Sequence, residues 1–142
     1  MISSKFYEGL EAVLYIALNS GAGPVSSKDI SSSQGKLPRH LEPVLQLLVQ
    51  NGILKGTKGP KGGYTLAKEK RKITIATLYK IFLSTATKST KQSPLFQKIC
   101  APLQKESENK IIQYFEQTTL EDLCKKSLET TPTPKKSDNF NI

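Results

Sequence analysis

Two lysines flank a Gly-Pro pair in the most glycine-rich stretch of this 142-residue chain, Thr57-Lys58-Gly59-Pro60-Lys61-Gly62-Gly63-Tyr64. Glycine permits a tight reversal of the backbone, and proline stiffens one side of it. The short runs on either side, residues 53–57 and 63–66, are compatible with two strands that pair as a hairpin. The loop thus presents ammonium groups on a thin support, which suits contact with anions such as phosphates. A solvated turn without a binding role uses the same residue types.

Other side chains that could support chemistry are few. The chain has one histidine, His40, and two cysteines, Cys100 and Cys124. Lys98, Lys105 and a helix start are expected to favour the thiolate of Cys100, which makes it a candidate redox thiol; the alternative is a small, semi-buried residue at a helix entrance. Cys124 is expected in the core. Because no acid–base pair and no phosphate-binding glycine fingerprint is present, we expect no enzyme activity.

Basic residues are concentrated in the N-terminal half. The formal net charge is +9, and residues 1–80 hold 12 of the 21 Lys and Arg but 5 of the 12 Asp and Glu. This charge favours phosphate-rich or anionic partners and speeds encounter with them. No run approaches the roughly 18–20 apolar residues of a membrane span, and the N-terminus has no signal-peptide pattern. We therefore expect a cytoplasmic protein with no membrane partner.

Hydrophobic periodicity predicts three helices before the hairpin. Apolar residues recur at helical spacing within 6–19 and again within 38–51. Between them, Ser26 or Ser27 can cap a short helix that ends near Ser33. Two helices joined by a tight glycine-containing turn form a helix-turn-helix, and the hairpin adds a wing. The predicted fold class is mainly α with a small β-hairpin.

Pro43 interrupts this pattern. It falls inside the third predicted helix, where it removes one backbone hydrogen bond and is expected to kink the helix start. A helix that begins nearer His40 than Pro38 is the alternative.

Helices are also predicted after the hairpin. Thr74 is expected to cap a fourth helix, and Pro102 to divide the helical region that begins at Pro94, so that the long helix starts at the second proline. Thr119 and Asp122 have the spacing of a capping box that opens a short last helix.

The order of these elements and motifs resembles the family of bacterial winged-helix transcriptional regulators that includes IscR, NsrR and CymR. The resembling pieces are Ser4-Lys5-Phe6-Tyr7, Ala12-Val13-Leu14-Tyr15-Ile16-Ala17, Gly23-Pro24-Val25, Asp29-Ile30, Gln34-Gly35, Leu41-Glu42, Asn51-Gly52-Ile53-Leu54, Gly59-Pro60-Lys61-Gly62-Gly63-Tyr64, Leu66-Ala67, Ile73-Thr74, Cys100-Ala101-Pro102-Leu103 and Thr118-Thr119-Leu120-Glu121-Asp122-Leu123. They extend from about residue 2 to residue 128.

The resemblance implies a sequence-specific DNA-binding regulator, with repression as its expected action. It also implies a homodimer, because in this family the long helix, here 102–116, crosses to the partner subunit, and two wings then address two half-sites of a palindromic operator. The implied organisation is a winged helix-turn-helix DNA-binding domain at 1–83, a connector at 84–93, dimerisation helices at 94–128 and a disordered tail at 129–142.

DNA contacts are expected from the N-terminal end of the third helix, from the wing and from the starts of the first two helices. The N-terminal end of the third helix would enter the major groove, where Arg39 can pair bidentately with guanine. His40 can contact a base or phosphate, or can instead be a partly buried ring near the turn. The full set of candidate DNA-binding residues is Lys5, Ser27, Lys28, Lys36, Pro38, Arg39, His40, Lys58, Gly59, Lys61 and Tyr64.

Many members of the resembling family bind an iron–sulfur cluster through three cysteines, and here only Cys100 matches a ligand position. Leu103 stands where the IscR pattern has a histidine. One soft ligand per subunit cannot hold such a cluster in the usual way, so we expect no metal and no cofactor. Two alternatives stay open: a winged-helix protein-interaction module, and a thiol-based redox-responsive regulator that uses Cys100. A protein or small-molecule effector is possible in principle, but the sequence identifies none.

Overall fold

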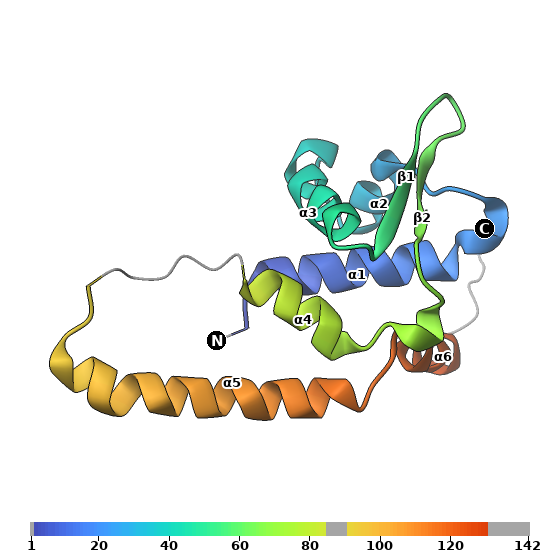
Figure 1. Ribbon diagram of the computed structural model, residues 1–142. Coiled ribbons are helices and arrows are strands. Elements are labelled where there is room, and N and C mark those ends of the chain that lie inside the picture. Colours follow the sequence, from blue (N-terminus) through green and yellow to red (C-terminus); the bar gives the residue numbers. More distant parts are fainter. Residues whose placement is uncertain (1, 85–90, 131–142) are drawn as a thin grey trace.

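The computed structural model describes residues 2–84 and 91–130, which form helices around one two-stranded hairpin (Figure 1). The α-helices are α1 (Ser4–Leu18), α2 (Ser27–Ser33), α3 (Pro38–Gln50), α4 (Ile75–Leu83), α5 (Ala101–Glu116) and α6 (Leu120–Thr130). The strands are β1 (Leu54–Thr57) and β2 (Gly63–Leu66), and single helical turns occur at η1 (Ser20–Ala22), η2 (Lys70–Lys72) and η3 (Phe96–Cys100).

Helix α1 is the central element of the core. It begins where the Ser3 side chain accepts a hydrogen bond from the backbone N–H of Phe6, the usual role of an N-cap serine. The Phe6 ring packs against the rings of Tyr79 in α4 and Phe115 in α5, each with a centroid separation of 5.5 Å. Gly9 lets α4 approach closely, because a Cβ at this position would lie 2.4 Å from the Phe82 ring. Helix α1 therefore joins α4 and α5 through one aromatic cluster.

Helices α2 and α3 form the expected helix-turn-helix. Ser26 caps α2 by accepting from the N–H of Asp29, and Gly35 turns the chain with a positive φ of 66°. Helix α3 begins at Pro38, a favourable first position for proline. Pro43 is accommodated inside α3, so the alternative start nearer His40 is wrong.

Beyond α3, the predicted hairpin is present. Strands β1 and β2 pair antiparallel, with Leu54 opposite Leu66 and Thr57 opposite Gly63. Val25 extends this ribbon from the other side, because its N–H donates to Tyr64 at 2.9 Å and its carbonyl accepts from Tyr64 at 2.8 Å. The hairpin is thereby fastened to the segment that leads into α2.

Helix α6 returns to the N-terminal part of the chain. The Ile75 N–H donates to the carbonyl of Thr118 at 3.0 Å, and the Leu120 N–H donates to the carbonyl of Ile73 at 2.8 Å. Leu120 is fully buried and Cys124 is 2% exposed, both in the same core as α1. Cys124 is thus a core residue, as expected, whereas Leu128 is 73% exposed.

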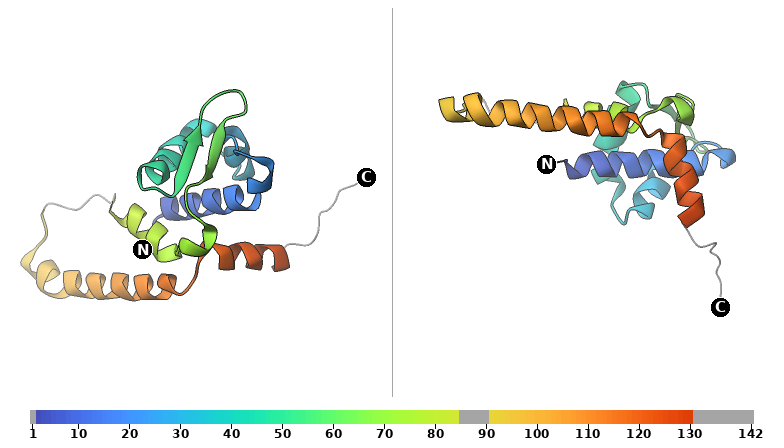
Figure 2. Two further views of the ribbon diagram at one scale, coloured as in Figure 1. Left: turned by 45° about the vertical axis from the view of Figure 1, so that its right-hand side comes forward. Right: turned by 90° about the horizontal axis from the view of Figure 1, so that it is seen from below.

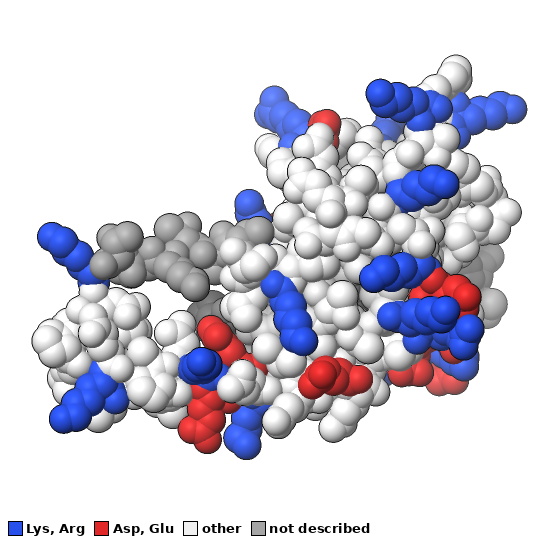
Figure 3. All heavy atoms as spheres, viewed as in Figure 1, with Lys and Arg blue, Asp and Glu red and all other residues white. Residues whose placement is uncertain are grey.

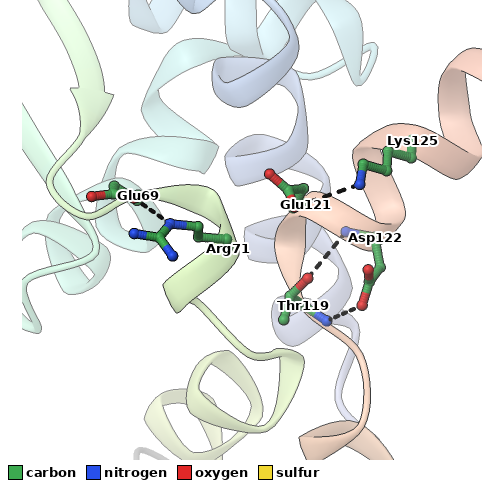
Figure 4. Close-up of polar contacts among 6 residues, drawn as sticks. All are labelled: Glu69, Arg71, Thr119, Glu121, Asp122 and Lys125. Carbon is green, nitrogen blue, oxygen red and sulfur yellow. Dashed lines mark hydrogen bonds and ion pairs between the residues drawn. The ribbon is translucent and has the colours of Figure 1, made fainter.

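The start of α6 has the predicted capping box (Figure 4). The Thr119 N–H donates to Asp122 Oδ2 at 2.9 Å, and the Asp122 N–H donates to Thr119 Oγ1 at 3.1 Å. Hydrogen bonding to the Asp122 carboxylate, mainly from the Thr119 N–H and secondarily from the Thr119 hydroxyl, holds the pKa of Asp122 below its usual value. The same view includes an exposed Glu69–Arg71 pair on η2 and a Glu121–Lys125 pair on α6.

Helix α5 differs from the other helices because none of its residues is buried. Its C-terminal part packs on α4, whereas its N-terminal part extends past the body of the molecule in each of the views (Figures 1 and 2). The chain is already helical from Pro94, and the π-helical turn η3 leads directly into α5. The long α-helix begins at Ala101, as predicted for Pro102, and the proline occupies its first turn, where its missing N–H costs little. Because η3 leads into α5 without a break, Pro102 marks the change from π- to α-helix and not a gap between two helices.

Parts of the predicted connector and tail lie outside the described residues, namely 85–90 and 131–142. Within the described part, α6 continues to Thr130 and so includes the first two residues of the predicted tail. None of the helices in the described ranges is long and apolar enough to cross a membrane.

Candidate nucleic-acid interface

The N-terminal end of α3 is exposed to solvent on its outer side. Pro38, Arg39 and His40 are all exposed, and Leu37 before them is 52% exposed. The alternative of a partly buried His40 is therefore wrong. The opposite side of α3 is buried through its apolar residues Leu41, Val44, Leu45 and Leu48, which fix the helix against the core. This arrangement holds the first turn of α3 outward, as a helix that enters a DNA groove requires.

Lys36, also a candidate for contact with DNA, is held by α1. Its ammonium lies 2.5 Å from Glu8 Oε1, and the neighbouring Gln34 side chain donates to the Glu8 carbonyl at 3.0 Å. Both side chains of the ion pair are only partly exposed. These contacts attach the turn between α2 and α3 to α1, so Lys36 has a positioning role that sequence reasoning missed.

The wing is a five-residue loop between Thr57 and Gly63. The Gly62 N–H donates to the Gly59 carbonyl at 2.9 Å, which closes a turn around Pro60 and Lys61. Gly59 has a φ of 109°, and a Cβ on Gly62 would lie 2.1 Å from the Thr57 carbonyl oxygen. Glycine is required at both positions for this shape. Lys58 and Lys61 are exposed at the tip.

The remaining candidates are spread around these two features. Lys5 and Lys28 are exposed near the starts of α1 and α2, and Ser27 is half-buried. Tyr64 is also half-buried; its backbone pairs with Val25, and its side chain lines a groove beside α3. The contact between Val25 and the wing was not predictable, because an isolated pair of backbone hydrogen bonds has no residue signature.

Charge and shape coincide at one end of the molecule. The N-terminal end of α3 and the wing tip extend to the same side, with α5 on the opposite side of the body (Figure 1). Basic side chains predominate around this end, with an acidic side chain visible beside them, whereas basic and acidic side chains are mixed along the edge that includes α5 and α6 (Figure 3). A cationic surface with two thin projections can approach the phosphates of a duplex and reach into its grooves.

A groove between α3 and the wing has a volume of about 590 Å³. Gln46 and Gln50 of α3 line it, together with Thr57 and Lys58 of the wing. Sequence reasoning missed both glutamines. Their spacing of four residues, on the side of α3 away from Leu45 and Leu48, was the available signal.

The two cysteines differ in their exposure to solvent. Cys100 is exposed at the end of η3, so the semi-buried alternative is wrong, and Cys124 is buried in α6. Burial raises the pKa of the Cys124 thiol, which keeps it protonated; nearby Lys70 opposes this effect. In the described part of the chain, no three or more His, Cys, Asp or Glu side chains come together as metal ligands.

The chain is similar to a known protein family and to curated relatives. A model of the Rrf2 family, described as an iron-dependent transcriptional regulator, matches residues 2–126. The transcriptional regulator IscR of Escherichia coli is 40% identical over 74 residues, which are 52% of this chain and 46% of that protein. The matched region thus spans about half the length of the curated relatives. The resemblance expected from the sequence is confirmed.

Solved structures show the same fold. IscR of T. potens superposes with a TM-score of 0.71 at 26% identity, covering 95% of this chain and 93% of that one. CymR of B. subtilis, described as its global cysteine regulator, gives a TM-score of 0.69 at 26% identity, covering 89% and 97%. These likenesses confirm the predicted mainly helical, winged-helix fold class.

Proposed function

Since the chain belongs to the Rrf2 family of transcriptional regulators, we propose that it binds double-stranded DNA sequence-specifically, as a homodimer on a palindromic operator, and acts as a repressor. One observation carries this proposal: the exposed first turn of α3 and the wing tip extend to the same side, with basic residues around both. Helix α3 enters the major groove, and the wing enters the adjacent minor groove.

Arg39 is the principal base-reading residue in this proposal. It is exposed at the second position of α3, and a guanidinium can donate two parallel hydrogen bonds to guanine. Lys58 and Lys61 contact the minor groove and its phosphates. Lys5, Ser27 and Lys28 contact phosphates and set the register of the protein on the duplex. Lys36, which is paired with Glu8, supports the turn before α3 instead of reading bases.

Exposed apolar side chains along the α5 segment support the homodimer. The exposed fractions are 71% for Leu95, 57% for Ile99, 66% for Leu103 and 68% for Tyr114. Near the other end of α5, an apolar depression of about 380 Å³ is lined by Ile2, Tyr7, Lys110, Ile111, Tyr114 and Phe115. Exposed apolar surface of this kind is typical of an interface. In a two-fold dimer the same patch from each copy covers the other.

We further propose that regulation does not use an iron–sulfur cluster, although the family description refers to iron. The chain has two cysteines, of which Cys124 is enclosed in the core and Cys100 is exposed. Clusters of the common types need four protein ligands, most of them cysteine thiolates. This donor set does not fit such a cluster, so no step of the proposed function depends on one.

The direct test is capture of bound fragments from sheared genomic DNA by the purified full-length chain, at about 0.15 M salt with excess nonspecific competitor. Recovery of a palindromic motif is the expected result. Recovery of no motif, with binding that disappears uniformly as salt rises, would favour the winged-helix protein-interaction module instead.

A second candidate concerns the signal: regulation through the Cys100 thiol. Its exposure in η3, at the entrance to the proposed dimer helix, favours this site over buried Cys124. Alkylation of Cys100 is expected to change DNA affinity in the wild-type chain and not in a Cys100→Ser variant. Equal affinity before and after alkylation in both chains would rule this signal out.

A further inference from the structure

The groove between α3 and the wing holds uncharged hydrogen-bonding side chains, of which the proposed function uses only Ser27. Its lining includes Gln46 and Gln50 from α3, Thr57 and Tyr64 from the hairpin, and Ser27 from α2. Lys58, at one end of the wing loop, is its one charged lining residue within the described part of the chain.

The walls of this groove are fixed by backbone contacts. Val25 and Tyr64 exchange two hydrogen bonds of 2.9 and 2.8 Å, which tie β2 to the segment before α2. A Cβ on Gly63 would lie 2.4 Å from the Val25 carbonyl oxygen, so the two backbones touch there. The position of the wing relative to the segment that leads into α2 is thus set before any ligand arrives, which lowers the entropy cost of binding.

Both glutamines are exposed and available for a ligand. Among the described residues, neither side-chain amide has a hydrogen-bond partner within the protein. Each amide offers two N–H donors, and neither carries a charge.

The position of the glutamines along α3 decides which part of a duplex they meet. Gln46 and Gln50 follow Pro38 by eight and twelve residues, or about 12 and 18 Å along the helix axis. The major groove of B-DNA is about 8.5 Å deep. If α3 enters by its N-terminal end, these side chains therefore lie above the base edges, at the level of the sugar–phosphate backbone.

We propose that this groove seats the one phosphodiester strand that separates the major groove, occupied by α3, from the minor groove, occupied by the wing, and that Gln46 and Gln50 donate hydrogen bonds to its phosphate oxygens. This inference rests on the proposed function and adds two positioning residues to it. Such contacts fix register without reading sequence. Because the donors are neutral, they strengthen binding without releasing additional counterions.

The test is a double variant of the full chain, Gln46→Ala with Gln50→Ala, measured on its selected operator and on an unrelated duplex over a salt series. Affinity is expected to fall about tenfold on both duplexes, with an unchanged slope of log Kd against log salt. Lys61→Ala provides the contrast, because losing one phosphate-neutralising lysine lowers that slope by about 0.9. Gln92→Ala, at an exposed glutamine outside the helices assigned to DNA contact and to the dimer, is the matched control and leaves affinity unchanged.

A second experiment replaces one phosphate of the operator at a time with a neutral methylphosphonate. It identifies independently which phosphate lies in the groove between α3 and the wing. Several positions are expected to weaken binding of the wild-type chain, and at one of them, in each half-site, the effect is expected to be smaller for the double variant. Unchanged affinity of a fully folded double variant would overturn the inference. A loss of affinity confined to the operator, with an altered base preference, would also overturn it, because the glutamines would then read bases. A wild-type chain that selects no operator would instead overturn the proposed function, and this inference with it.

Discussion

Helices α3 and α5 both leave one side uncovered, but the two free surfaces have opposite chemistry. Helix α3 buries four apolar residues and exposes Pro38, Arg39, His40 and the two glutamines. Helix α5 buries none of its residues completely. Large apolar side chains remain exposed on α5 and on the turn before it, with Ile99 at 57% and Leu103 at 66%.

The difference in chemistry suits one surface to binding DNA and the other to binding a second copy of the chain. Polar and cationic groups on a free helix surface are well solvated alone and can exchange water for phosphates or base edges. Exposed leucine and isoleucine side chains gain free energy only when another apolar surface covers them. The two surfaces lie on opposite sides of the body, so a dimer formed through α5 leaves both wings free (Figure 1).

The largest expected effect is on the apolar surface. Ile99→Asp places a charge in the proposed dimer interface twice, once per copy. Losing about 1.5–3 kcal/mol of burial at each copy is expected to raise the dimer dissociation constant by about 10² to 10⁴. Sedimentation over a concentration series measures this change.

Asn109→Asp is the matched control for that variant. Asn109 is exposed on α5 about one and two-thirds turns beyond Leu103, and therefore lies on a different side of the helix. It adds the same charge and is expected to leave the dimer intact. Equal dimer stability in both variants would remove the distinction between α3 and α5.

Leu120→Ala tests whether α6 belongs with the N-terminal body or with α5. Leu120 is fully buried in the core that includes α1, and its N–H donates to the Ile73 carbonyl, which ties the two segments together. Truncation of a buried leucine costs about 2–5 kcal/mol, measured by urea unfolding followed by circular dichroism. Leu128→Ala, at a 73% exposed position in the same helix, is the control and is expected to change stability little.

Arg39→Ala tests the polar surface of α3. The variant is expected to lose about 1–3 kcal/mol of discrimination at one base position in each half-site, and to dimerise normally. Arg71→Ala, an exposed arginine on η2 paired with Glu69, is the control. A base preference that survives Arg39→Ala would show that α3 does not read DNA through this residue.

The smallest effect is expected at the capping box of α6. Because hydrogen bonds from Thr119 lower the pKa of Asp122 in the folded state, the unfolded chain binds this proton more readily. The stabilising contribution is therefore complete above the unfolded-state pKa near 4 and is lost as pH falls through the lower folded-state pKa. Asp122→Asn is expected to melt slightly below the wild type at neutral pH, with a difference that shrinks in acid. A pH-independent difference would contradict this account.

Local patterns predicted much of the fold. The caps at Ser26, Thr74 and Thr119, the hairpin and the buried side of α3 all depend on residues close together in the sequence. Contacts between distant segments had no such signal. The return of α6 to Ile73 and the Val25–Tyr64 pair are made by backbone groups that every residue possesses.

In the candidate interface too, features set by local sequence were predictable and contacts between distant segments were not. Exposure of Arg39, Lys58 and Lys61 agrees with their predicted use, because helix starts and turn tips are exposed by local geometry. The attachment of Lys36 to Glu8 was not predictable, since the two residues are 28 positions apart. The groove that contains Gln46 and Gln50 likewise exists only once α3 and the wing lie side by side.

Hydrogen exchange of the full chain, free and bound to its selected operator, tests the separation of the two surfaces most directly. The account predicts slower amide exchange on DNA binding at the first turn of α3 and in the wing, residues 36–41 and 57–64, with no change at 95–103. Slower exchange at 95–103 without protection of the wing would contradict it, because DNA would then bind the surface assigned to the second copy.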